Sequence, residues 1–181
     1  MQSRSLSVIA ALFVAVGLVV GAGSAAADAN PEKVFAGKII TSDKKFPAKA
    51  RSGSAYVAAI RKQSKSAFME DKSKQWKIYF AAFFRKPLAD IEVIVKLYDY
   101  QQPGRPMVAS FEQYVPERGV KALLADFVLD RKLVGANREL TMVLEVGGQQ
   151  IAVGKFKIAG EVERLSGKVD FSADDEDEEE Q

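Results

Sequence analysis

The side chains available for chemistry in this sequence are lysines, arginines and carboxylates, because its 181 residues include no histidine and no cysteine. Without histidine there is no imidazole base, no Ser-His-Asp triad and almost no common zinc site. Without cysteine there is no thiol nucleophile, no thiolate metal site and no disulfide. Most hydrolase and metalloenzyme mechanisms require these groups. We therefore predict a protein that is not an enzyme and that has no catalytic residue, metal ligand or cofactor.

The most distinctive charged region lies between residues 44 and 74, where bases outnumber the acids Glu70 and Asp71. Such a region could meet an anionic polymer or an anionic lipid surface, and an ordinary solvated surface is the alternative. We predict an anion-binding face formed by Lys44, Lys45, Lys49, Arg51, Arg61, Lys62, Lys65, Lys72 and Lys74.

The C-terminal end of the chain is opposite in charge to the long region before it. Residues 28–169 hold 25 bases and 16 acids, a net of +9, whereas residues 170–181 hold 8 acids and no base. Like charges at this density repel one another, which predicts a disordered tail over residues 173–181. We expect this acidic tail to screen the basic domain and to tune its binding to anions.

Two further patterns suggest catalysis only weakly. Ser42-Asp43-Lys44-Lys45 matches the S-x-x-K pattern of serine acyl enzymes, but those enzymes are larger and place the serine at a helix start. We interpret the match as chance. A pair of carboxylates could serve a polysaccharide-acting enzyme, which is the alternative function. The candidate acids are Glu112, Glu117, Asp126 and Asp130.

The N-terminus has the pattern of a secretory signal peptide. Arg4 precedes an apolar run over residues 8–20, and small residues then lead to Ala25-Ala26-Ala27. This pattern predicts cleavage after Ala27 and export to the periplasm or the extracellular space, with no membrane span left in the mature protein. An uncleaved anchor is the alternative. Export disfavours nucleic acid as a partner.

The core is predicted around two long strands, residues 76–85 and 91–100, joined by a loop that contains Pro87. In the first strand the even positions from Trp76 to Phe84 are all apolar, and alternate side chains of a strand share one face. Its odd positions are mixed, so we expect this strand to be covered on both faces. In the second strand Ile91, Val93, Val95 and Leu97 share one face.

Alternating patterns and turn signals predict about eight strands in total. The others are residues 34–40, 55–60, 107–115, 139–146 and 151–158, and residues 120–134, which fit either strand or helix and which we assign to a strand. Residues 61–75 are predicted as a loop with a helical turn near residues 67–71. Pro103-Gly104 predicts a type II turn, Gly147-Gly148 a hairpin, and a change of apolar parity at Gly154 a β-bulge.

These elements predict an all-β protein in which residues 28–172 form one antiparallel, immunoglobulin-like β-sandwich. The expected function is that of an exported, non-catalytic binding or accessory module of the cell envelope. Its expected partner is an anionic envelope polymer, a lipid surface or another envelope protein. A purely structural envelope protein is a further alternative.

Overall fold

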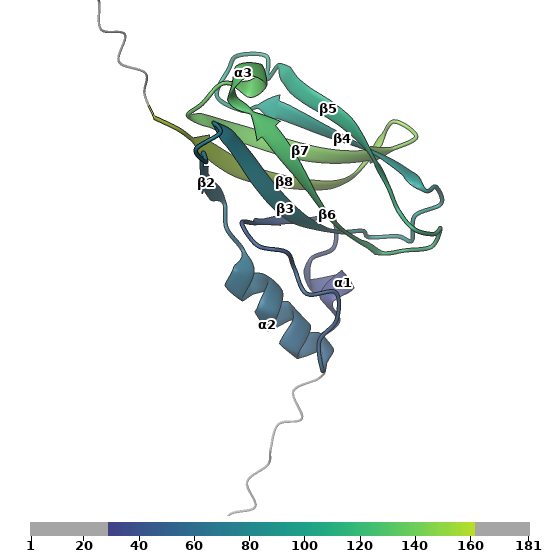
Figure 1. Ribbon diagram of the computed structural model, residues 1–181. Coiled ribbons are helices and arrows are strands. Elements are labelled where there is room, and N and C mark those ends of the chain that lie inside the picture. The colour runs from purple at the N-terminus through teal and green to yellow at the C-terminus, as the bar shows by residue number, and fades with distance from the viewer. Residues whose placement is uncertain (1–28, 162–181) are drawn as a thin grey trace, which may run out of the picture.

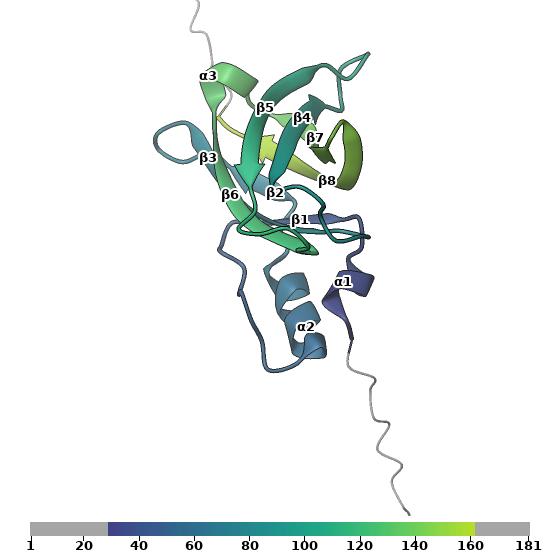
Figure 2. The ribbon, with the colours of Figure 1, turned by 90° about the vertical axis from the view of Figure 1, so that its right-hand side faces the viewer.

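The computed structural model describes residues 29–161 and is mostly β, with 47% strand and 14% helix. Its strands form two sheets, and two helices lie beyond the smaller sheet (Figures 1 and 2). An all-β sandwich is therefore supported. The predicted signal peptide, the segment 162–172 of the predicted domain and the acidic tail lie outside the described residues.

The smaller sheet has the order β1-β3-β6 and the larger has the order β2-β8-β7-β4-β5. All neighbouring strands are antiparallel except β2 and β8, which are parallel. The strands are β1 (Ile39–Ser42), β2 (Ala67–Met69), β3 (Gln75–Phe83), β4 (Glu92–Asp99), β5 (Met107–Tyr114), β6 (Ala122–Asp130), β7 (Arg138–Val146) and β8 (Gln149–Ala159).

The two long strands predicted at the centre, β3 and β4, are confirmed, but they lie in different sheets. β3 pairs with β1 and β6, whereas β4 pairs with β5 and β7. The alternating apolar faces of β3 and β4 both point into the layer between the sheets, so the loop after β3 crosses from one sheet to the other. Almost fully buried there are Trp76, Ile78, Phe80, Val93, Val95 and Leu97.

The second face of β3 is also covered, as its mixed sequence predicts, and a helix covers it. Ala81 and Phe83 pack in a second apolar cluster with Val57 and Ile60 of α2 (Gly53–Gln63). The prediction of a strand over residues 55–60 was therefore wrong. The Ser52 hydroxyl caps the helix by accepting a hydrogen bond from Ala55 N, and Val57 and Ile60 share one buried face.

Two shorter assignments are also corrected. The strand predicted over residues 34–40 begins only at Ile39, because Val34 ends the short helix α1 (Pro31–Val34), in which the Asn30 side chain caps the amides of Glu32 and Lys33. The predicted helical turn near residue 67 is instead β2. Phe68 is buried between two exposed neighbours, and β2 pairs with the end of β8.

The strand assigned to residues 120–134 and the hairpin at Gly147-Gly148 are confirmed, with shorter bounds for the strand, whereas the predicted bulge lies at another residue. Residues 122–130 form a strand, β6, which is followed by the short helix α3 (Arg131–Val134). Gly147 and Gly148 make the β7–β8 hairpin with φ of 56° and 78°. The bulge lies three residues before Gly154, at Ile151, opposite the step from Leu144 to Glu145. At Gly154 itself, β1 comes so close that an added Cβ would lie 2.6 Å from the Ile39 oxygen.

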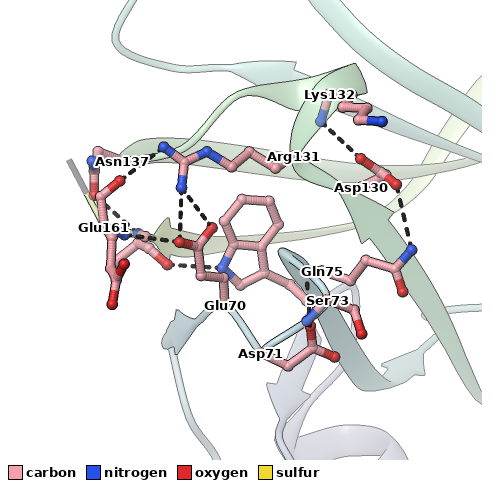
Figure 3. A network of polar contacts seen from close by, with 12 residues as sticks. Glu70, Asp71, Ser73, Gln75, Asp130, Arg131, Lys132, Asn137 and Glu161 are labelled. Atoms are coloured by element: carbon pink, nitrogen blue, oxygen red, sulfur yellow. Dashed lines mark hydrogen bonds and ion pairs between the residues drawn. The ribbon is translucent and has the colours of Figure 1, made fainter. Parts of the chain in front are cut away.

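A nearly buried ion pair fixes the end of β8 to β2 and α3 (Figure 3). Nη1 of Arg131 donates to both oxygens of Glu70, at 2.8 and 3.1 Å, and the side chain of Glu70 is only 8% exposed. The Glu161 amide also donates to Glu70, and Arg131 Nη2 donates to the Glu161 carbonyl. Glu70 and Arg131 are charge partners of each other and also hold the backbone of Glu161, so we assign this network to stability.

Candidate anion-binding site

Three of the nine predicted basic residues gather around one hollow of about 470 Å³ at the C-terminal end of α2. We call this cavity the basic hollow. Lys44 follows β1, Lys62 lies in the last turn of α2, and Lys65 follows that helix. The complete lining is Asp43, Lys44, Ala59, Lys62, Gln63, Ser64 and Lys65.

Backbone and hydroxyl hydrogen bonds hold the two segments of the basic hollow together. The Lys65 amide donates to the Thr41 carbonyl at 2.8 Å, and the Thr41 hydroxyl donates to the Lys65 carbonyl at 2.6 Å. The Ser42 hydroxyl accepts from the Lys44 amide at 3.0 Å. Thr41 and Ser42 are both buried, so these bonds are protected from water. The lysine backbones are therefore fixed before any ligand binds.

One carboxylate lies among the lysines. Lys65 Nζ is 2.7 Å from Asp43 Oδ2, and this hydrogen bond is the main cause that lowers the pKa of Asp43 below its ordinary value of 3.8. Lys44 adds a smaller electrostatic contribution in the same direction. Within residues 29–161, neither Lys44 nor Lys62 forms an ion pair. The basic hollow thus carries three positive charges against one negative charge.

The other six predicted residues do not join this hollow. Lys45 lines a separate cavity of about 130 Å³ that also contains Asp126. Lys49, Arg51 and Arg61 are exposed on the loop before α2 and on α2 itself. Lys72 and Lys74 lie in the turn between β2 and β3. Of the nine predicted residues, only Lys44, Lys62 and Lys65 line the basic hollow.

The four acids considered for catalysis lie apart and have separate roles. Asp126 pairs with Lys77, Glu112 accepts a hydrogen bond from the Tyr114 hydroxyl, and Glu117 is exposed in a loop. Asp130 caps α3, and the hydrogen bond from the Lys132 amide is the main cause that lowers the pKa of its carboxyl.

Ser42 of the S-x-x-K pattern is fully buried and caps the turn after β1, so it is not placed as a nucleophile. In the part of the chain that the structure describes, no three acidic side chains group closely enough to hold a metal ion. No helix among those residues is long and apolar enough to cross a membrane. The sequence matches no protein-family model, and no curated protein is significantly similar to it.

Four residues that line the basic hollow were not predicted from the sequence: Asp43, Ala59, Gln63 and Ser64. Asp43 is the charged one among them. The sequence feature that could have pointed to Asp43 is its position directly before Lys44 and Lys45 at the end of a strand. The residue that pairs with it, Lys65, lies 22 positions further along the chain. Sequence spacing alone could not bring the two together.

Proposed function

We propose that this protein is an exported, non-catalytic β-sandwich module that binds an acidic polysaccharide of the cell envelope through the basic hollow. The observation that carries the proposal is the cluster of Lys44, Lys62 and Lys65 around the single carboxylate of Asp43. In this proposal, residues 1–27 direct export to the periplasm or the extracellular space. The domain then acts as an immunoglobulin-like accessory module.

The chemistry of the lining favours a sugar acid over a lipid surface. The ammonium groups of Lys44 and Lys62 suit carboxylate, sulfate or phosphate groups of a ligand. Asp43 and Ser64 add acceptors for hydroxyl groups, which an acidic polysaccharide carries next to its charges. A flat anionic membrane would instead bring negative headgroups against Asp43. A sugar unit can also enter a concave site, whereas a flat membrane surface cannot.

The rigid construction of the basic hollow supports binding as well. A site whose backbone is already ordered loses less conformational entropy when a ligand binds. Lys65 is held by Thr41 on its backbone and by Asp43 on its side chain. Lys62 is held on the last turn of α2, whose apolar face packs on β3.

The test is calorimetric titration of the mature protein, residues 28–181, with sodium polygalacturonate at low ionic strength. Lys62→Gln and Lys65→Gln together should weaken binding by roughly five- to thirtyfold, because each exposed contact contributes about 0.5–1 kcal/mol. The control Lys72→Gln with Lys132→Gln removes the same charge outside the basic hollow and should leave most of the affinity. Binding should also weaken as salt rises.

Two comparison ligands separate the alternatives. Neutral dextran should not bind, because it lacks the charge that the lysines recognise. Vesicles of phosphatidylglycerol should bind more weakly than polygalacturonate. If wild type binds no acidic polysaccharide, or if both double variants lose affinity equally, the basic hollow is not the binding site.

A further inference from the structure

A second cavity lies on the outer face of the larger sheet, and none of the nine residues of the predicted anion-binding face lines it. It has a volume of about 210 Å³. Four of its lining residues form one row across neighbouring chain segments: Ser66, Lys157, Glu139 and Tyr100. The Lys157 amide donates to the Ser66 carbonyl, Glu139 is the register partner of Lys157, and the Tyr100 amide donates to the Glu139 carbonyl. We call this cavity the Tyr100 groove.

The row of four residues runs across the strands, so the Tyr100 groove extends from Ser66 to Tyr100. Neighbouring strands lie about 4.8 Å apart, so four adjacent segments span roughly 14 Å across the sheet. One end of the row is Tyr100, directly after β4. The other end is Ser66, the residue next to Lys65 of the basic hollow. The two cavities are therefore lined by consecutive residues of one segment.

Two cations converge on the ring of Tyr100, which is 41% exposed. Lys155 Nζ lies 4.0 Å from the ring centroid, and Arg105 Cζ lies 4.7 Å from it. Within the described residues neither of these cations forms an ion pair, so their remaining N–H donors face solvent or a ligand. The ring thus holds two positive charges at the end of the groove without neutralising them.

The position of Arg105 is built into the backbone. The turn Gln102–Arg105 is of the type II form that Pro103-Gly104 predicts, with φ of 77° at Gly104 and a hydrogen bond from the Arg105 amide to the Gln102 carbonyl. Arg105 itself has φ of 47°, a conformation that few residues other than glycine adopt. Such conformations are concentrated at functional sites.

The Tyr100 groove also repeats the composition of the basic hollow. Two cations, Lys155 and Lys157, line it with one carboxylate, Glu139, which forms an ion pair with Lys157. Arg105 adds a further positive charge beside the Tyr100 ring at its end. Ser66 adds a hydroxyl to the lining. A ligand that suits both cavities carries anionic groups and hydroxyl groups at repeated positions along its length.

We infer that the Tyr100 groove is a second subsite for the same ligand, so that the ligand is a linear acidic polysaccharide long enough to bind both cavities at once. This inference rests on the proposed function. A chain that binds two linked subsites gains affinity through effective concentration, by about a hundredfold or more over a fragment that binds only one.

The test compares digalacturonate with a long oligogalacturonate on the mature protein at low ionic strength. Wild type should bind the long oligomer at least about a hundredfold more tightly. In the triple variant Tyr100→Ala, Arg105→Gln and Lys155→Gln, this advantage should fall to about tenfold or less, while digalacturonate still shifts the amide resonances of Lys62 and Lys65. Tyr100→Phe keeps the ring and should behave as wild type.

The control variant Lys33→Gln with Lys132→Gln removes two positive charges elsewhere and should retain the advantage of the long oligomer. If the triple variant keeps that advantage, the Tyr100 groove is not a subsite and the proposed function of the basic hollow still stands. If wild type binds neither ligand, the proposed function and this inference both fall.

Discussion

The Glu70–Arg131 pair allows a stability prediction whose size follows from its burial. Glu70→Gln keeps the shape of the side chain but removes its charge, which breaks the ion pair between Glu70 and Arg131. The side chains of Glu70 and Arg131 are 8% and 17% exposed. An exposed pair contributes about 0–1 kcal/mol, and breaking a fully buried one costs about 3–5 kcal/mol. We therefore expect Glu70→Gln to lower the free energy of unfolding by about 2–3 kcal/mol.

Urea unfolding of the mature protein, followed by tryptophan fluorescence, measures this change. The single tryptophan, Trp76, is a suitable probe because its indole N–H donates to the Ala159 carbonyl beside the pair. The matched control is Asp43→Asn, which breaks the Lys65–Asp43 pair, whose side chains are 47% and 45% exposed. That change should cost less than about 1 kcal/mol. A Glu70→Gln variant whose free energy of unfolding lies within about 0.5 kcal/mol of wild type would show that the pair contributes no more than an exposed one.

Three further predictions concern the core, a titration and the tail. Phe80→Ala should cost about 3–5 kcal/mol in urea unfolding, because Phe80 is fully buried between the sheets; an unchanged midpoint would contradict this. The pKa of the Asp43 carboxyl should lie below 3.8 in an NMR titration, and Lys65→Met should move it toward 3.8. The stability that the Lys65–Asp43 pair contributes is therefore present above pH 3.8 and is lost as the pH falls through the lower pKa of the folded state. Deleting residues 174–181 should raise the affinity for polygalacturonate at low salt, and equal binding with and without them would leave the tail without a screening role.

The sequence was sufficient to predict the position of strands in which every second side chain points into the core between the sheets. β3, β4 and β7 are of this kind, and their bounds were predicted within two residues. The sequence was not sufficient to predict which sheet each strand joins. β3 and β4 are neighbours along the chain, yet they lie in different sheets, because each also pairs with a strand that is distant in the sequence, β3 with β6 and β4 with β7.

The helix α2 was missed because its apolar residues are few. Tyr56, Val57 and Ile60 fit a helical face, but over six residues they fit a strand nearly as well. The stronger signal was the cap, since Ser52 lies three residues before Ala55 and accepts its amide hydrogen bond. Tertiary packing on Ala81 and Phe83 then stabilises the helix.

The basic hollow could be predicted only as part of a larger charged region. Lys44 and Lys62 are distant in the sequence, and the hydrogen bonds between Thr41 and Lys65 bring their segments together. Lys72 and Lys74, which belong to the same charged region of the sequence, lie in another turn. The cations of the Tyr100 groove come from the β4–β5 turn and from β8, so no local pattern marks them.

Chemical-shift mapping with oligogalacturonate shows directly whether an acidic polysaccharide binds in the basic hollow. The mature protein, labelled with ¹⁵N, would be titrated at low ionic strength, and every amide from residue 29 to residue 161 would be followed. The largest shifts are expected at Lys44, Lys62, Gln63 and Lys65, which line the basic hollow. Shifts centred on Lys72 and Lys74, or no shifts at all, would contradict binding in the basic hollow.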